Sequence, residues 1–319
     1  MNQLTRGIAA VVLATVLSTV TAGCSASEPP PKPVLEKTSI KVAVFATADA
    51  APLFLAVSKG YFKEEGLEVL PTIATGGGTV VPMTEAGQVD LAQTDYVSLI
   101  MAASHGKRMK VVGSMAEAGA GSYALVVRDD SPIRSVKDLK GKSVAVNNLN
   151  GFSTLAVGAM LTDSGLDNHD VKFIERPFPD MKNALTHGKI DAAWLAEPFI
   201  SDGAPKLRQI PDTVSDRIRG LPVGGWIATD EWREENPQTL AAFQRAIAKA
   251  QRLAAGDRKE VEKMLPTYMK IGRETAEKTI LGTYPTTMDP RQLQRVADFM
   301  QQNRYLKAPV DVKTFIASG

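Results

Sequence analysis

The sequence has 319 residues, of which 44% are hydrophobic and 23% are charged, with 37 basic and 35 acidic side chains. That length predicts one large domain or two ordinary ones with a substantial core. A net charge of +2 gives no support for nucleic-acid binding, and a single cysteine excludes an internal disulfide or a site with two protein thiolates. Three histidines leave little material for a zinc or iron centre, although carboxylate sites stay possible. We expect no metal and no cofactor.

Residues 1–23 predict a secretory signal peptide. Arg6 is the only charge in this segment, an apolar run extends from Ile8 to Val20, and small residues precede Cys24. The run is shorter than the ~18 residues of a membrane span. The end of the segment resembles a bacterial lipobox, which implies cleavage before Cys24 and acylation of that residue. An ordinary signal peptide with an incidental cysteine is the alternative.

Residues 24–38 form a Pro-rich stretch with prolines at positions 29, 30, 31 and 33. Such polar stretches stay extended and semi-rigid because they have little to bury. With a lipid at Cys24, this stretch predicts a tether that holds a soluble body near a membrane.

From residue 39 onward, short apolar runs alternate with helical stretches, which predicts α/β units with mostly parallel sheets. The expected strands of the first unit are 40–45, 66–70 and 89–92, and those of the second are 142–146, 171–175 and 190–192. Val42 and Asp90 are 48 positions apart, and Val144 and Asp191 are 47 positions apart. This nearly equal spacing predicts that the second unit repeats the first.

The repeat predicts two lobes, with lobe I at 39–122 and lobe II at 123–222. Residues 223–319 hold no third copy, and we expect amphipathic helices at 231–251, 259–269 and 291–304 that return to complete lobe I. The chain would cross between lobes near 121–125 and again near 221–227. Glycines at these crossings fit a hinge or, equally, tight turns: Gly119, Gly121, Gly224 and Gly225.

Loops at the carboxyl ends of the strands are expected to face a shared cleft, because ligands bind there in open α/β sheets. Their short polar residues suit a small ligand with an anionic or strongly polar head: Thr47, Gly77, Thr79, Gln93, Asn147, Ser153 and Thr154. Each of these residues is also typical of a helix cap or turn.

Aromatic and acidic residues complete the expected cleft. Tyr96, Trp194 and Trp226 could pack against an apolar part of the ligand, with burial in the core as the alternative for both tryptophans. Asp49 and Glu197 could receive an ammonium or ring amino group. We expect Asp90 and Asp191 to fix strand-to-loop geometry instead.

No catalytic motif is present, since the sequence lacks a nucleophile elbow, a metalloprotease histidine pair and a Walker loop. We therefore expect no catalytic residues. His105, His169 and His187 fall in polar or turn segments, which favours a surface position for all three.

Several segments resemble one family over nearly the whole chain after residue 38. The stretch 56–69, with Lys59, Gly60, Tyr61 and Phe62, resembles the early signature of bacterial solute-binding proteins of ABC importers. These importers belong to the nitrate, sulfonate and taurine, and thiamine-pyrimidine-precursor class. Further segments fit the same family: 87–90, 135–141, 142–146, 188–199 with Glu197 and Pro198, and 309–312.

The resemblance implies a type II periplasmic-binding-protein fold, with two α/β lobes joined by a hinge of two crossings. It also implies a monomeric, lipid-anchored extracytoplasmic protein that delivers a small-molecule solute to ABC permease and ATPase subunits. A compact anion such as a sulfonate would suit the Gly-rich loop with Thr79, whereas Tyr96, Trp194 and Glu197 suit an amino-bearing heteroaromatic compound. No arginine clearly belongs to the cleft, which favours the second solute class.

Two other functions remain open. A related pyrimidine synthase uses a similar scaffold, but its family carries a cysteine-rich motif and an active-site histidine, and this chain has only Cys24. A lipoprotein that presents a bound ligand to a sensor would show the same sequence features as a transport component.

Overall fold

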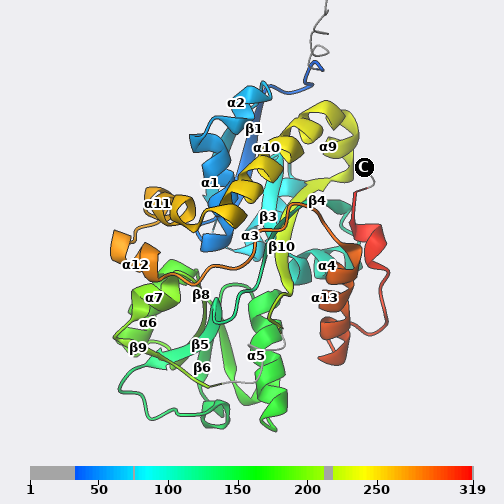
Figure 1. The fold of residues 1–319 in the computed structure, drawn as a ribbon. Coiled ribbons are helices and arrows are strands. Elements are labelled where there is room, and N and C mark those ends of the chain that lie inside the picture. The colour runs from blue at the N-terminus through cyan, green and yellow to red at the C-terminus, as the bar shows by residue number, and fades with distance from the viewer. Residues whose placement is uncertain (1–32, 75, 212–217, 318–319) are drawn as a thin grey trace, which may run out of the picture. The chain divides into compact units, whose positions relative to one another are not determined.

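A computed structural model describes residues 33–74, 76–211 and 218–317, and its strands form two sheets (Figure 1). The first sheet has the order β2-β1-β3-β10-β4, and the second has the order β7-β6-β8-β5-β9. The strands of the first sheet are β1 (Ser39–Phe45), β2 (Glu68–Ala74), β3 (Leu91–Asp95), β4 (Met109–Glu117) and β10 (Pro222–Thr229). Those of the second are β5 (Tyr123–Arg128), β6 (Ser143–Val146), β7 (Lys172–Glu175), β8 (Ala192–Ala196) and β9 (Leu207–Gln209).

Helices cover both sheets. Lobe I, which is the first sheet with its helices, has η1 (Ala48–Ala50), α1 (Ala51–Ser58), α2 (Tyr61–Glu64), α3 (Gly77–Glu85) and α4 (Tyr96–Ser104). Lobe II, which is the second sheet with its helices, has η2 (Val136–Leu139), α5 (Phe152–Asp163), η3 (Asn168–Asp170), α6 (Phe178–Thr186) and α7 (Phe199–Gly203). The chain then continues with α9 (Asp230–Glu235), α10 (Pro237–Gly256), α11 (Arg258–Tyr268), α12 (Arg273–Lys278), α13 (Pro290–Gln302) and η4 (Val312–Phe315).

Strand β1 shows why the first sheet is buried on both faces. Its side chains alternate in direction, so that Val42 and Val44 join the core cluster under α1 and α10, while Ala43 and Phe45 join the cluster on the other face. β1 pairs in parallel with β2 and β3. A parallel strand covered on both faces has a nearly continuous apolar sequence, which is the pattern of β1.

The expected repeat is confirmed by the topology of the two sheets. Asp90 accepts a hydrogen bond from the main-chain nitrogen of Lys41 at 2.8 Å, next to the register pair Val42 and Leu91. Asp191 accepts one from the main-chain nitrogen of Ser143 at 2.8 Å, next to the register pair Val144 and Ala192. In each lobe, the aspartate thus connects the start of the third parallel strand to the first strand by a hydrogen bond. This agrees with the structural role expected from the sequence.

The second crossing lies between β9 and β10, so most of the range expected for it, 221–227, falls within a strand of lobe I. Residues 222–229 are strand β10, which pairs antiparallel with β3 and β4 inside the first sheet. Gly224 and Gly225 allow neighbouring strands to approach, since a Cβ at Gly224 would lie 2.3 Å from the Thr94 carbonyl oxygen and one at Gly225 2.6 Å from that of Gly113. At the first crossing, between β4 and β5, Gly121 has a φ of +82°, which favours glycine.

The C-terminal helices differ from expectation in two respects. The helix expected at 231–251 is divided into α9 and α10, because Pro237 begins a new helix after Asn236. α10 and α11 pack on α1, and α13 packs on α4, as expected for helices that complete lobe I (Figure 1). α12, however, contacts α7 of lobe II.

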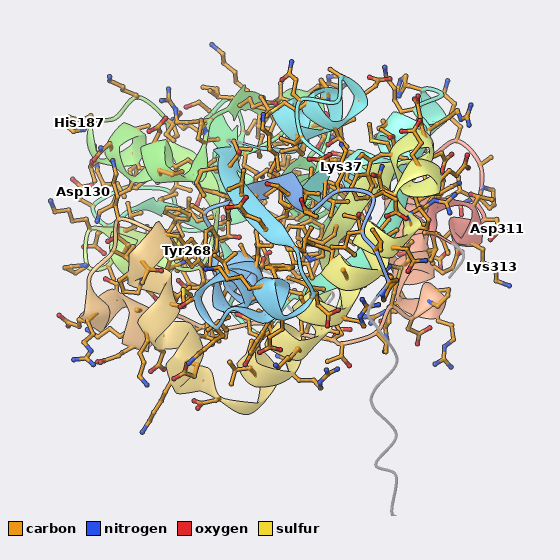
Figure 2. All side chains as sticks on the ribbon, turned by 90° about the horizontal axis from the view of Figure 1, so that it is seen from above. Lys37, Asp130, His187, Tyr268, Asp311 and Lys313 are labelled. Carbon is orange, nitrogen blue, oxygen red and sulfur yellow. The ribbon has the colours of Figure 1, made fainter. Side chains whose placement is uncertain are left out.

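The signal peptide, Cys24 and most of the tether lie outside the described residues, so those interpretations stay predictions. In the described part of the chain, no helix combines the length and apolar character that a membrane span requires. All three histidines are exposed, as the sequence predicts, and Figure 2 shows His187 at the periphery.

Candidate functional site

A pocket between the two lobes is the candidate site. Its empty volume is about 430 Å³, including its mouth. Lobe I contributes Phe45, Thr47, Asp49, Gln93, Asp95, Met115 and Val223, and lobe II contributes Tyr123, Asn147, Phe152, Ser153, Phe178, Trp194 and Ala196. Five of these residues lie at or just after the carboxyl ends of strands, which is where α/β sheets bind ligands: Phe45, Thr47, Asp95, Asn147 and Ala196.

Aromatic side chains form much of the lobe II wall. Tyr123 stands edge-on to Phe152 with ring centroids 5.7 Å apart, and it lies nearly parallel to Trp194 at 6.2 Å. Phe178 adds another ring from the start of α6, and Phe45 faces the pocket from the end of β1. This wall can bind the flat apolar surface of a ring.

Two carboxylates from lobe I supply the charge of the pocket. Burial raises the pKa of Asp49 to about 6, although the Tyr123 hydroxyl donates a hydrogen bond to its Oδ2 at 2.5 Å and acts in the opposite direction. Burial also raises the pKa of Asp95, against hydrogen bonds from Ser98 and from the main chain of Phe152. Among the residues that the structure describes, Asp49 and Asp95 are the charged residues that line the pocket.

Two tyrosines hold the loop that carries Thr47 and Asp49. The Tyr268 hydroxyl donates to the carbonyl oxygen of Thr47 at 2.8 Å, and the Tyr284 hydroxyl donates to that of Ala48 at 3.0 Å. Tyr268, labelled in Figure 2, also stacks on Phe54 of α1 with ring centroids 3.8 Å apart. Burial raises the pKa of both tyrosines, which therefore remain donors at neutral pH.

Two polar atoms that belong to lining residues are buried and have no hydrogen-bond partner in the described part of the chain: Thr47 Oγ1 and Trp194 Nε1. Thr47 is 5% exposed and Trp194 is 0% exposed. Buried polar groups are ordinarily paired, because an unpaired one loses its water without compensation. These two donors could be satisfied by an acceptor on a bound molecule, next to carboxylates that could accept from its donors.

The structure brings six of the twelve expected site residues to this pocket: Thr47, Asp49, Gln93, Asn147, Ser153 and Trp194. Gln93 lies in strand β3 instead of a loop, and its Oε1 accepts a hydrogen bond from the main-chain nitrogen of Phe45 at 2.9 Å. Ser153 lies in the first turn of α5.

Five of the other expected residues do not line the pocket. Trp226 is 1% exposed within β10 and packs edge-on against Phe243, so the core alternative holds for it. Tyr96 is buried at the start of α4, where a Cβ at Gly225 would meet its hydroxyl at 2.7 Å. Thr154 donates from within α5 to the Asn148 carbonyl oxygen at 2.7 Å.

The Gly-rich loop contacts lobe II. A Cβ at Gly76 would lie 2.6 Å from the Asn147 carbonyl oxygen, so this glycine allows a close approach of the two lobes. Thr79 donates to the Gly76 carbonyl oxygen at 2.7 Å, within the first turn of α3, which begins at Gly77. Thr79 does not line the pocket.

Glu197 joins lobe II to the C-terminal segment. Its carboxylate accepts hydrogen bonds from the Ser201 hydroxyl at 2.8 Å and from the main-chain nitrogen of Ile280 at 3.3 Å. Burial raises its pKa. Glu197 is 3% exposed and does not line the pocket, so its hydrogen bonds point to a structural role between α7 and the segment after α12.

Sequence reasoning missed Asp95 and four aromatic residues that line the pocket: Phe45, Tyr123, Phe152 and Phe178. Asp95 lies two residues after Gln93, so extending the third strand to its end would have found it. The aromatic residues lie in expected strands, loops or helix starts, and nothing in their spacing separates them from core residues.

The family model described as NMT1/THI5 like matches residues 47–260. The Bacillus subtilis protein YtlA is 28% identical over 218 residues, which cover 67% of this chain and 65% of YtlA. The 4-amino-5-hydroxymethyl-2-methylpyrimidine phosphate synthase of Aspergillus parasiticus is 26% identical over 222 residues, which cover 64% of this chain and 63% of the synthase. The chain thus spans less than two thirds of the length of either relative.

The fold matches a solved structure, the alkanesulfonate-binding protein SsuA from Xanthomonas axonopodis pv. citri bound to MOPS. The TM-score is 0.74 at 18% sequence identity, and the match covers 90% of this chain and 100% of SsuA. The expected α/β fold with the two lobes of a periplasmic binding protein is therefore confirmed. Because the NMT1/THI5-like model matches more than half of the sequence, this protein belongs to the NMT1/THI5-like family.

Proposed function

We propose that this protein is the extracytoplasmic solute-binding component of an ABC importer. It holds a small amino-bearing heteroaromatic compound between its lobes and delivers it to a permease. The solute class is argued from the pocket itself. Its described lining combines two carboxylates with a wall of aromatic rings and contains no lysine or arginine. A ring amino group would donate to Asp49 or Asp95, while Thr47 and Trp194 would donate to ring acceptors.

The membrane context of this proposal rests on the sequence. A lipid on Cys24 and the Pro-rich tether would keep a monomeric binding body close to its permease. The family and the two-lobed fold support solute binding, and closure of the lobes around the solute would be the form that the permease reads.

The proposal is tested with two probes on the full chain. 4-Amino-5-hydroxymethyl-2-methylpyrimidine at 100-fold excess over its Kd is expected to stabilise the fold by about 2.7 kcal/mol, whereas MOPS is expected to leave the melting temperature unchanged. Native mass spectrometry of the protein as purified would show whether a solute is retained. Stabilisation by MOPS alone would favour the sulfonate reading and contradict the proposed solute class.

Thr47→Val offers a finer test of the pocket. Valine keeps the shape of threonine but removes the unpaired hydroxyl, so we expect the affinity for the pyrimidine probe to fall at least fivefold, without loss of stability. Thr94→Val is the matched control, because Thr94 Oγ1 is likewise buried and without a partner, yet Thr94 does not line the pocket. Isothermal titration calorimetry measures the affinity of both variants for the pyrimidine probe. An equal loss of affinity in the two variants would argue against a contact between Thr47 and the solute.

A synthase activity, as named for the Aspergillus relative, is the second candidate. The whole sequence contains one cysteine, so the cysteine-rich motif that the resemblance attributes to such synthases is missing. None of the three histidines lines the pocket. We therefore propose binding without catalysis.

A further inference from the structure

Helix α5 of lobe II begins without a capping side chain of its own. Its N-cap residue is Gly151, which provides no side-chain hydrogen bond. The main-chain nitrogen of Phe152, the first residue of α5, instead donates to Asp95 Oδ1 at 3.0 Å. Asp95 belongs to lobe I, where it ends β3. A carboxylate from one lobe therefore caps a helix of the other.

The same carboxylate also caps a helix of its own lobe. Asp95 is the N-cap residue of α4, and its Oδ1 accepts from the main-chain nitrogen of Ser98 at 2.8 Å. The Ser98 hydroxyl donates to Asp95 Oδ2 at 2.5 Å and accepts a hydrogen bond from Asn148 Nδ2 of lobe II at 2.7 Å. Asp95 and Ser98 thus connect the starts of α4 and α5 through two hydrogen bonds that cross between the lobes.

Glycine at position 151 makes this contact possible. A Cβ at Gly151 would lie 3.1 Å from Asp95 Oδ2 and 2.9 Å from Asn148 Nδ2, so a larger residue would displace the side chains that connect the two helix starts. Glycine at position 151 therefore explains both observations: α5 has no capping side chain of its own, and Asp95 has room to approach.

The junction is also a wall of the pocket, because Asp95, Phe152 and Ser153 all line it. We propose that Asp95 is a positioning residue that couples the pocket to closure of the lobes. Its carboxylate caps α5 only while the lobes are in contact, and the cap holds Phe152 and Ser153 at the pocket. When the lobes separate, the Phe152 nitrogen loses this partner. The link to a solute rests on the proposed function, whereas the link to lobe closure does not.

The experiment measures the distance between the lobes without any solute. Spin labels are attached to Lys63→Cys in α2 and Lys137→Cys in η2, both exposed positions, in the full chain carrying Cys24→Ser. Double electron–electron resonance then reports the populations of short and long distances. We expect Asp95→Ala to lower the ratio of the short-distance to the long-distance population at least fivefold. Asp95→Asn, which keeps an acceptor oxygen, should restore most of that ratio.

Two further variants separate closure from stability. Gly151→Ala leaves Asp95 and the cap of α4 in place, and we expect it to shift the distances in the same direction as Asp95→Ala. Asp257→Ala removes a cap within lobe I, where Asp257 accepts from the main chain of Lys259 at 3.0 Å, and should lower the melting temperature without changing the distances. Identical distance distributions in the parent chain, Asp95→Ala and Gly151→Ala would overturn the proposal. A failure of every solute to bind would count against the proposed function but would leave this result intact.

Discussion

Replacing Asp49 by asparagine is expected to raise the free energy of unfolding at pH 8. Burial raises the pKa of Asp49 to about 6, roughly two units above that of an unfolded aspartate. Because the pKa is higher in the folded state, the ionised side chain destabilises the fold, at most by roughly 3 kcal/mol above pH 6. This cost shrinks as the pH falls from about 6 to about 4 and is absent below that range. Asparagine keeps an acceptor for the Tyr123 hydroxyl and carries no charge.

Urea unfolding at pH 8 and at pH 4 measures this effect. The asparagine variant should gain stability over the parent chain at pH 8 and little or none at pH 4. Asp129→Asn, at an exposed carboxylate outside the pocket, should show no such difference. Equal unfolding free energies for the parent and Asp49→Asn at both pH values would contradict a buried, destabilising charge.

The same substitution is expected to weaken binding of the pyrimidine probe by about 100-fold, the equivalent of a charge-assisted hydrogen bond of about 3 kcal/mol. For the parent chain, protonation of Asp49 competes with the solute amino group. The affinity should therefore fall as the pH is lowered below about 6, by up to tenfold per pH unit. Calorimetry between pH 8 and pH 5, corrected for titration of the probe itself, checks this dependence. A pH-independent affinity would remove Asp49 from the contacts of the solute.

Gly224→Ala is expected to destabilise the protein by more than about 3 kcal/mol or to prevent folding. A Cβ at this position would lie 2.3 Å from the Thr94 carbonyl oxygen and 3.2 Å from the Asp95 Cα, and both are main-chain atoms of β3. The strand cannot yield as a flexible side chain would, since β10 pairs with both β3 and β4. The methyl group would thus separate the strand that carries Gln93 and Asp95 from its neighbour.

Gly256→Ala is the matched control for this substitution. Gly256 ends α10, and no atom lies within 4 Å of the place its Cβ would take. Alanine there should be neutral or stabilise by up to about 1 kcal/mol, because it favours the helix and restricts the unfolded chain. Urea unfolding of both variants makes the comparison, and similar stabilities would show that β10 has more room than the distances indicate.

The sequence predicted the architecture because the architecture follows from local patterns. Alternating apolar runs, glycines after helices and the paired aspartates Asp90 and Asp191 each depend on a few neighbouring residues. The strand position of Gly224 and Gly225 escaped prediction because these glycines have the same local signature in a hinge and in a strand that must approach its neighbours closely. Only the positions of Thr94 and Gly113 distinguish the two cases.

Half of the expected site residues line the pocket, for a similar reason. Residues directly after β1 and β6, such as Thr47 and Asn147, follow from the strand ends alone. Trp194 and Trp226 are both tryptophans in apolar strands, and which face of a sheet each one occupies depends on which helices cover that face. The Glu197 carboxylate is hydrogen-bonded to Ser201 and to Ile280, which lies 83 positions later in the chain, and Glu197 does not line the pocket.

The two tyrosines that hold the loop at Thr47 and Ala48 have a consequence for the order in which the site is completed. Every lining residue is synthesised by position 223, whereas the supporting hydroxyls belong to Tyr268 and Tyr284. A growing chain therefore carries these pocket side chains well before the two hydroxyls can support the loop. We expect the pocket to reach its final shape last, and a chain that ends after β10 would keep these lining residues yet lack both supporting hydroxyls.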